Sequence, residues 1–141
     1  MEPTLTDTFA KLRKALQFEC GSGASEEEVS QAEAILKVTF PEAYRQFLRC
    51  FGYAEWDGSF IAGVDPEGLY SVTEYTQEER ELGKKYGSRM PPHAVVISTD
   101  IILLCPPSDD AGIVRSIGGV TAAEKFRWPS FAHYVQWRLG L

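Results

Sequence analysis

The sequence predicts an α+β fold, in which a mostly antiparallel sheet packs against several helices. Helical periodicity dominates the first part of the chain, β-branched apolar runs follow in the middle, and another helical pattern ends it. This order is typical of helices gathered on a sheet rather than of alternating strands and helices. At 141 residues the chain can bury a sizeable core, so we expect residues 1–141 to form a single domain.

The N-terminal segment, residues 1–20, is expected to contain an amphipathic helix over residues 4–18. Its apolar side chains recur at helical spacing, which places them on one side. They are Leu5, Phe9, Leu12 and Leu16. The next segment, residues 20–23 with the sequence Cys-Gly-Ser-Gly, is predicted as a short flexible joint.

Residues 25–52 predict two short helices joined by a tight corner. Ser25 and Glu28 match the capping box, in which each side chain bonds the other residue's backbone N–H. Pro41 suits the first turn of the second helix, and Gly52 suits its end. The apolar faces are expected to be Val29, Ala32, Ile35 and Leu36, then Tyr44, Phe47, Leu48 and Phe51.

The segment after the helix pair is predicted to mix short elements. Residues 53–58 are expected to form a loop with two aromatic residues among acids, and residues 59–64 a strand. Residues 65–68, Asp-Pro-Glu-Gly, carry a strong turn signal. A helix is expected over residues 72–85. A break near Thr76 stays open as an alternative, because Thr76 and Glu79 offer a second capping box.

The last third of the chain predicts a hairpin, a further strand and a final helix. The β-branched runs 93–98 and 101–105 favour a hairpin of central strands that are covered on both faces. Residues 113–117 are predicted as a strand, and Gly118-Gly119 as a turn. Ser130 can cap the final helix. Its apolar face is expected to be Phe131, Tyr134, Val135 and Leu139.

The helix pair resembles the signature of the SUKH superfamily, in its Smi/Knr-like branch. That signature combines an acidic capped helix, an apolar residue, a Leu-Pro or Phe-Pro corner, Tyr-x-x-Phe-Leu and a glycine. The matching residues are Glu26 to Glu28, Leu36, Phe40-Pro41, Tyr44, Phe47-Leu48 and Gly52. The family commonly has Asn before the glycine, where this chain has Phe51. Together with the Ser-Phe start of the final helix, the resemblance extends over residues 25–139 and implies one SUKH-like domain.

Composition argues against a membrane-spanning or disulfide-stabilised protein. No apolar run approaches the roughly 20 residues that span a bilayer, and the N-terminus lacks the pattern of a signal peptide. Cys20, Cys50 and Cys105 are widely spaced and fit no metal or redox motif, so they are interpreted as free thiols. We therefore expect a cytoplasmic protein.

Negative charge is concentrated in one part of the chain. Residues 55–81, here called the acidic band, hold eight acids and one base, a net of −7 against −6 for the whole chain. Such a band can steer a basic partner and would repel nucleic acid. The alternative interpretation is a solvated face that only keeps the protein soluble.

The sequence favours a protein without enzymatic activity. It contains no phosphate-binding loop, dinucleotide-binding glycine motif, zinc-protease motif or nucleophile elbow. His93 and His133 are interpreted as structural, although a Cys105–His93 pair stays open as an alternative. No cofactor and no metal ion is expected, because the acids lack the spacing of a calcium loop.

Protein binding is the better use of the acidic band. Interfaces depend on a few aromatic anchors surrounded by polar groups, and Tyr53, Trp56, Tyr70 and Tyr75 lie in or beside the band. The alternative for Trp56 and Tyr75 is a place in the core. The predicted partner-binding residues are Glu55, Trp56, Asp57, Asp65, Glu67, Glu74, Tyr75, Glu78 and Glu79.

The resemblance implies a more specific role than the residues do. Many bacterial members of the SUKH superfamily are immunity proteins, which bind a cognate polymorphic or contact-dependent toxin and block it stoichiometrically. Such toxins are often nucleases with basic surfaces, so a cognate protein toxin with a basic surface is the expected partner, without nucleic acid or membrane. A regulatory or scaffold binding domain, as in eukaryotic relatives, and a small enzyme with a scattered site stay open as alternatives.

Overall fold

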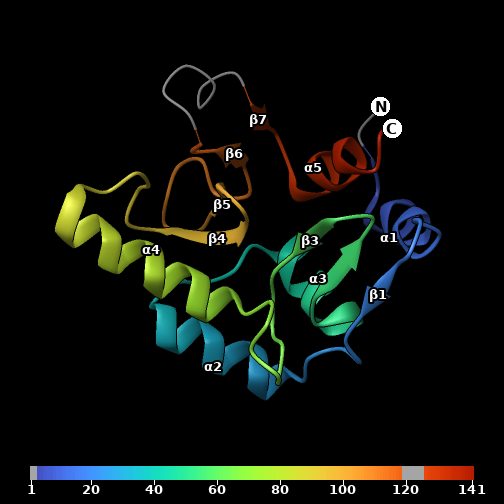
Figure 1. The fold of residues 1–141 in the computed structure, drawn as a ribbon, viewed down its shortest axis with the longest axis horizontal. Helices are drawn as coiled ribbons and strands as arrows, with labels where there is room; N and C mark the ends of the chain where they lie inside the picture. The colour runs from blue at the N-terminus through green and yellow to red at the C-terminus, as the bar shows by residue number, and fades with distance from the viewer. Residues whose placement is uncertain (1–2, 119–125) are drawn as a thin grey trace.

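The computed structural model describes residues 3–118 and 126–141. Within them the chain forms five helices and two antiparallel sheets, which confirms the predicted α+β fold (Figure 1). The helices are α1 (Leu5–Arg13), α2 (Glu26–Leu36), α3 (Glu42–Phe51), α4 (Val72–Tyr86) and α5 (Phe131–Arg138). The strands are β1 (Glu19–Cys20), β2 (Ala54–Trp56), β3 (Ser59–Ile61), β4 (Ala94–Ser98), β5 (Ile101–Leu104), β6 (Val114–Ser116) and β7 (Arg127–Trp128).

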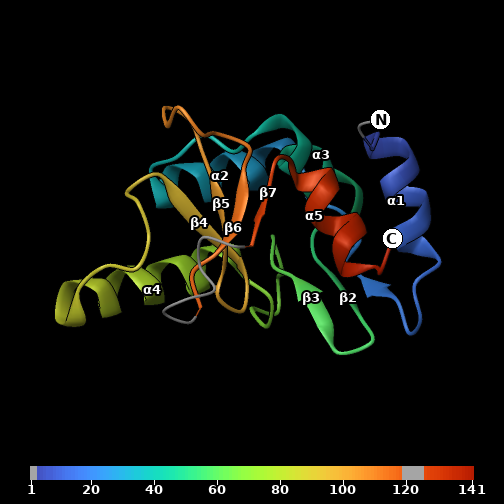
Figure 2. The same cartoon turned by 90° about the horizontal axis from the view of Figure 1, so that it is seen from above.

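The two sheets meet where β3 runs beside β4. The first sheet has the order β1-β2-β3 and the second β4-β5-β6-β7. At the junction the Ala62 N–H donates to the Ile97 carbonyl at 2.7 Å, and the Ser98 hydroxyl donates to the Phe60 carbonyl at 2.8 Å. The predicted hairpin is confirmed as β4 and β5. β4 is an edge strand of its sheet rather than a central one, yet it is wholly buried because β3 and α4 contact it (Figure 2).

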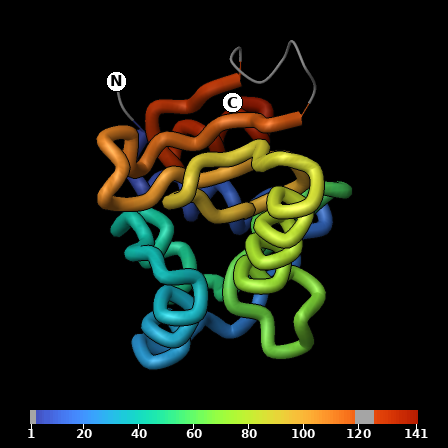
Figure 3. Tube along the Cα trace, turned by 90° about the vertical axis from the view of Figure 1, so that its left-hand side faces the viewer, coloured from blue at the N-terminus to red at the C-terminus, as the bar shows by residue number. Residues whose placement is uncertain are grey.

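Helix α4 packs against β4 of the second sheet, and α2 lies beside α4 (Figure 3). The Val96 N–H donates to the Thr76 hydroxyl at 2.9 Å, which fixes α4 on β4, and Arg80 donates to the Leu36 carbonyl at 2.8 Å, which fixes α4 on α2. The helix expected over residues 72–85 is confirmed as α4, and the alternative of a break near Thr76 does not occur. Ser71 caps α4 instead, and the Thr76 hydroxyl serves the sheet rather than a second cap.

The predicted helix pair is confirmed as α2 and α3. Ser25 and Glu28 form the capping box, with hydrogen bonds of 2.9 and 3.1 Å. Pro41 precedes α3 as its N-cap, and Gly52 ends the helix with a positive φ of 74°. The Gly52 carbonyl also accepts from the Val64 N–H at 2.9 Å, so the end of α3 holds the chain that leads into the 65–68 turn.

The main core is an aromatic cluster between α1, α3 and α5. Phe47 lies at its centre and contacts Phe9, Tyr44, Phe51 and Phe131 with ring centroids 5.4–6.4 Å apart. All five rings are buried. The cluster therefore holds α1, α3 and α5 together, and burial of such rings is a large part of the stability of a domain of this size.

The first sheet and the ends of the nearby helices differ from the sequence prediction. α1 ends at Arg13, and Leu16, expected on its buried side, is 68% exposed. Ile35 is likewise exposed rather than part of the apolar face of α2. Cys20, expected in the joint, belongs to β1 together with Glu19, and residues 54–56 form β2 where a loop was expected. The β2–β3 turn is Asp57-Gly58, both at positive φ, which is a known hairpin signal.

The C-terminal elements follow the prediction with one addition. Ser130 caps α5 by accepting from the His133 N–H at 3.2 Å, as expected. β7 was not predicted, because two residues carry no periodicity. The turn expected at Gly118-Gly119 lies partly outside the described residues. No helix in the described ranges is both long and apolar enough to cross a membrane.

Candidate protein-binding face

Four half-buried aromatic residues form a continuous row on the surface beside the first sheet. The ring centroids are 5.5 Å apart for Tyr53 and Tyr70, 5.0 Å for Tyr70 and Phe60, and 5.7 Å for Phe60 and Tyr75. Tyr53 precedes β2, Phe60 lies in β3, Tyr70 precedes α4 and Tyr75 lies in its first turns. We call these four residues the aromatic row.

Local hydrogen bonds hold the row in place. The Asp65 carboxylate accepts from the Glu67 N–H at 3.0 Å and from the Tyr70 N–H at 2.9 Å, so it fixes the 65–68 turn and the start of the next segment. The Tyr75 hydroxyl donates to the Leu69 carbonyl at 2.8 Å. A face whose rings are fixed before binding loses little conformational entropy when a partner docks.

Carboxylates without basic partners surround the row. They are Glu19, Glu55, Asp57, Asp65, Glu67, Glu74 and Glu78, here called the acidic rim. None of them lies within 4.0 Å of a Lys, Arg or His nitrogen in residues 3–118 and 126–141. Outside the rim, Glu26 pairs with Arg49 and Asp110 with Arg127, whereas Glu27, Glu28 and Asp109 have no such partner among the described residues. The seven carboxylates of the rim give the face of the aromatic row a negative potential.

The pKa values of the tyrosines follow from this environment. Burial, and then the charges of Glu78, Glu74 and Asp65, raise the pKa of Tyr75. Burial also raises the pKa of Tyr53, with Asp65 as the largest charge contribution. Acids from the turn and from α4 thus act on the same rings, which places them on one face.

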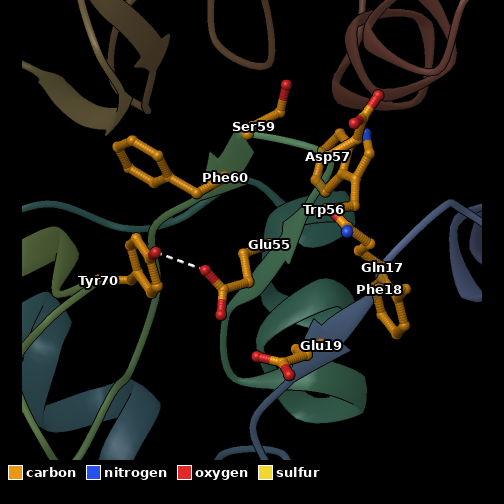
Figure 4. Close-up of a pocket in the computed structure, with 10 residues that line it drawn as sticks. Gln17, Phe18, Glu19, Glu55, Trp56, Asp57, Ser59, Phe60 and Tyr70 are labelled. Atoms are coloured by element: carbon orange, nitrogen blue, oxygen red, sulfur yellow. Dashed lines mark hydrogen bonds between the residues drawn. The ribbon is translucent and has the colours of Figure 1, made fainter.

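Two carboxylates face each other across β1 and β2. Glu19 is the register partner of Glu55, and the Tyr70 hydroxyl donates to Glu55 Oε2 at 2.5 Å (Figure 4). That hydrogen bond, together with burial, raises the pKa of Tyr70 to about 12. The pKa of Glu19 is raised because its protonated form can donate a hydrogen bond to Glu55, and then because the charge of Glu55 repels its ionised form. These side chains line a hollow of about 540 Å³ that extends to Asp57 and Phe60.

The structure does not bring all predicted binding residues to this face. Four of them are exposed in the rim, namely Asp57, Glu67, Glu74 and Glu78. Glu55 and Asp65 are half-buried members of the rim, and Tyr75 is half-buried in the row. Trp56 is only 4% exposed and belongs to the core, which was its alternative interpretation. Glu79 is 8% exposed and accepts two hydrogen bonds from Arg89, at 2.6 and 3.1 Å.

Sequence reasoning missed Glu19 and Phe60. Glu19 lies outside the acidic band and reaches the rim only through the β1–β2 pairing, for which two residues give no signal. Phe60 was assigned to a strand without a role. Alternation along β3 could have found it, since Phe60 is half-buried beside the buried Ile61.

The alternative catalytic residues do not form a reactive pair. Burial, with a smaller effect of Glu33, raises the pKa of Cys105 to about 12, so its thiol stays protonated at neutral pH. Cys105 contacts His93 through the backbone, where its N–H donates to the His93 carbonyl at 2.8 Å. His133 Nδ1 lies 2.6 Å from the Ser130 hydroxyl at the start of α5, which is a capping role. No group of metal-binding side chains occurs among the described residues.

Comparison with known proteins supplies the family. A search of curated proteins found no match to the chain. The SMI1 / KNR4 family (SUKH-1), by contrast, matches residues 23–137, a range that runs from the start of the helix pair to the last turn of α5. This range contains the aromatic row and all of the acidic rim except Glu19. The chain therefore belongs to the SMI1 / KNR4 family (SUKH-1).

Proposed function

We propose that the protein is an immunity protein that binds a cognate bacterial toxin and blocks it stoichiometrically. The toxin would be of the polymorphic or contact-dependent kind and would present a basic surface. The observation that carries the proposal is the aromatic row surrounded by carboxylates without basic partners. Membership of the SMI1 / KNR4 family (SUKH-1) supports it, since bacterial members of the superfamily are often immunity proteins.

The aromatic row supplies the affinity in this proposal. Half-buried Tyr and Phe side chains offer a large apolar area that costs little entropy to fix, and such residues dominate protein interfaces. Polar groups around them exclude water from the contact. A partner can contact several rings at once, because the four rings follow one another with centroids 5.0–5.7 Å apart.

The acidic rim supplies the choice of partner. Carboxylates that are not neutralised within the protein attract a basic surface, accelerate association and repel acidic competitors. A nuclease needs a basic surface to hold its phosphate substrate, so the rim would occupy the place of that substrate. Binding alone then blocks the toxin, and the immunity protein needs no catalysis of its own.

The test combines partner recovery with charge reversal. The tagged protein is captured from its native cells at low salt, the co-purifying toxin is identified by mass spectrometry, and protection is measured by co-expression. The variant Glu74→Lys/Glu78→Lys reverses two exposed rim charges and should abolish protection. Glu79 is left intact because its pair with Arg89 is structural.

A matched control separates the rim from net charge. Glu27→Lys/Asp109→Lys makes the same change of charge at exposed acids away from the aromatic row. It should protect like the wild type. Equal protection by both double variants, each folded by circular dichroism, would contradict the role of the acidic rim.

A further inference from the structure

A second hollow, of about 340 Å³, lies between α4 and the second sheet. It adjoins the aromatic row, because Phe60 and Tyr75 form part of its wall. Its volume is at the lower end of the range for ligand sites, so it suits a single side chain better than a large cofactor. The side chains of its floor and of its mouth determine which ligand it can accept.

The floor of this hollow is apolar. Val96 and Ile117 line it and are 9% and 8% exposed, while Leu82 lines it from α4 and is 46% exposed. Phe60 closes one side. An aliphatic stem placed here would cover Leu82 and displace water from apolar carbon, which is favourable by the hydrophobic effect.

The mouth of the hollow carries negative charge that the protein does not fully neutralise. Arg89 already engages both oxygens of Glu79 and lies 3.1 Å from Asp100 Oδ1. Three carboxylates, those of Glu78, Glu79 and Asp100, line the hollow against the single cation Arg89, and Glu78 has no ion pair among the described residues. The hollow therefore keeps an excess of negative charge, which can accept hydrogen bonds from a cation that enters it.

We propose that this hollow receives an arginine side chain from the basic protein partner. The inference rests on the proposed function and names the anchor that the partner would insert. Arginine combines an aliphatic stem with a planar cation, as the apolar floor and acidic mouth require. Its guanidinium can share two acceptors, Glu78 and Asp100, and stack on the ring of Tyr75, which a lysine ammonium does less well.

The test uses a fragment, so it needs no toxin. The full chain with labelled methyl groups is titrated with N-acetyl-arginine amide and followed by NMR. The methyl signals of Leu82, Val96 and Ile117 should shift and saturate, with a dissociation constant of about 1–10 mM for so small a ligand. N-acetyl-citrulline amide, which has the same shape without the charge, should cause no saturable shift, and the lysine analogue should bind more weakly.

Two variants on α4 form a matched pair. Glu78→Gln removes a carboxylate from the mouth and should weaken arginine binding by about twofold to fivefold, the range expected for one partly screened charge. Glu81→Gln makes the same change at an exposed acid of α4 that does not line the hollow and should leave binding unchanged.

The proposal is overturned by a flat titration, by citrulline or lysine analogues that bind as well as arginine, or by equal effects of the two variants. These results are independent of the toxin experiment. If the hollow binds arginine but the protein protects against no toxin, the proposed function alone is refuted. If protection needs the acidic rim but the titration is flat, this inference alone is refuted.

Discussion

Replacing Tyr70 by Phe removes one hydroxyl from the centre of the aromatic row and keeps the ring. That hydroxyl donates to Glu55 Oε2 at 2.5 Å, whereas the ring contacts to Tyr53 and Phe60 do not involve it. A hydrogen bond to a charged acceptor contributes about 1.5–3 kcal/mol when it is well shielded. Both side chains are only half-buried, so water can replace the donor, and we expect a loss of about 1 kcal/mol in unfolding free energy at pH 7.

The pH dependence of this loss is the sharper part of the prediction. Hydrogen bonding and burial raise the pKa of Tyr70 to about 12, whereas tyrosine in an unfolded chain titrates at about 10. A group whose pKa is raised on folding stabilises the protein fully below its unfolded pKa. The contribution of the hydroxyl should therefore be constant up to about pH 9 and decline as the pH rises from about 10 to about 12.

Urea unfolding of the wild type and of Tyr70→Phe, followed by circular dichroism, measures both effects. The slopes of the two transitions should agree, so that the midpoints report stability alone. The other tyrosines titrate in both proteins and cancel in the difference. Equal midpoints at pH 7, or a difference that grows above about pH 10, would refute the role given to this hydrogen bond.

Three further substitutions test the surroundings of the row. Glu19→Gln should raise the urea midpoint at pH 7, because it removes a charge that faces another carboxylate, and the gain should disappear below about pH 4, where Glu19 binds a proton in both states; a lower midpoint at pH 7 would contradict the repulsion. Arg89→Met should cost about 2–3 kcal/mol in urea unfolding, because it leaves the buried Glu79 carboxylate unpaired, and a further Glu79→Gln should restore part of that loss; no restoration would argue against the pair. Gly63→Ala should cost about 3 kcal/mol, because its Cβ would overlap a backbone oxygen, whereas the control Gly58→Ala, with open space around it, should cost about 1 kcal/mol; equal thermal midpoints would contradict the close approach.

Local signals made most of the fold predictable. The capping box of Ser25 and Glu28, the glycine that ends α3 and the β4–β5 hairpin each depend on residues close together in sequence. The acidic rim was found in large part for the same reason, because most of its members lie within one short segment. Features of this kind survive in the folded protein since no distant contact has to create them.

The features that the sequence did not predict depend on strand pairing between residues far apart in the chain. β1 has two residues and β2 has three, so neither gives a periodic signal in the sequence. Their antiparallel pairing defines them as strands and brings Glu19 opposite Glu55. Because alternate residues of a strand face opposite sides, β2 sends Glu55 to the surface and Trp56 to the core. A loop assignment hides this alternation, so both residues were expected on the same face.

Glu79 shows a related limit in a helix. Val72, Thr76 and Glu79 repeat at helical spacing and share the buried face of α4. Counting charge along the sequence cannot separate Glu79 from its exposed neighbour Glu78. What makes its burial tolerable is Arg89, which lies ten residues further on, beyond the end of the helix.

The placement of like charges bears on the choice between a binding face and a merely solvated one. Directly opposed like charges destabilise a strand pair, and Glu19 opposite Glu55 is such a pair. A face selected only for solubility would lose nothing if either position were neutral or basic, and stability would rise. The acids outside the rim that do form ion pairs, such as Glu26, Glu42 and Asp110, show that this chain can pair its charges. Under the proposed function, a basic partner that docks on the aromatic row would relieve this repulsion.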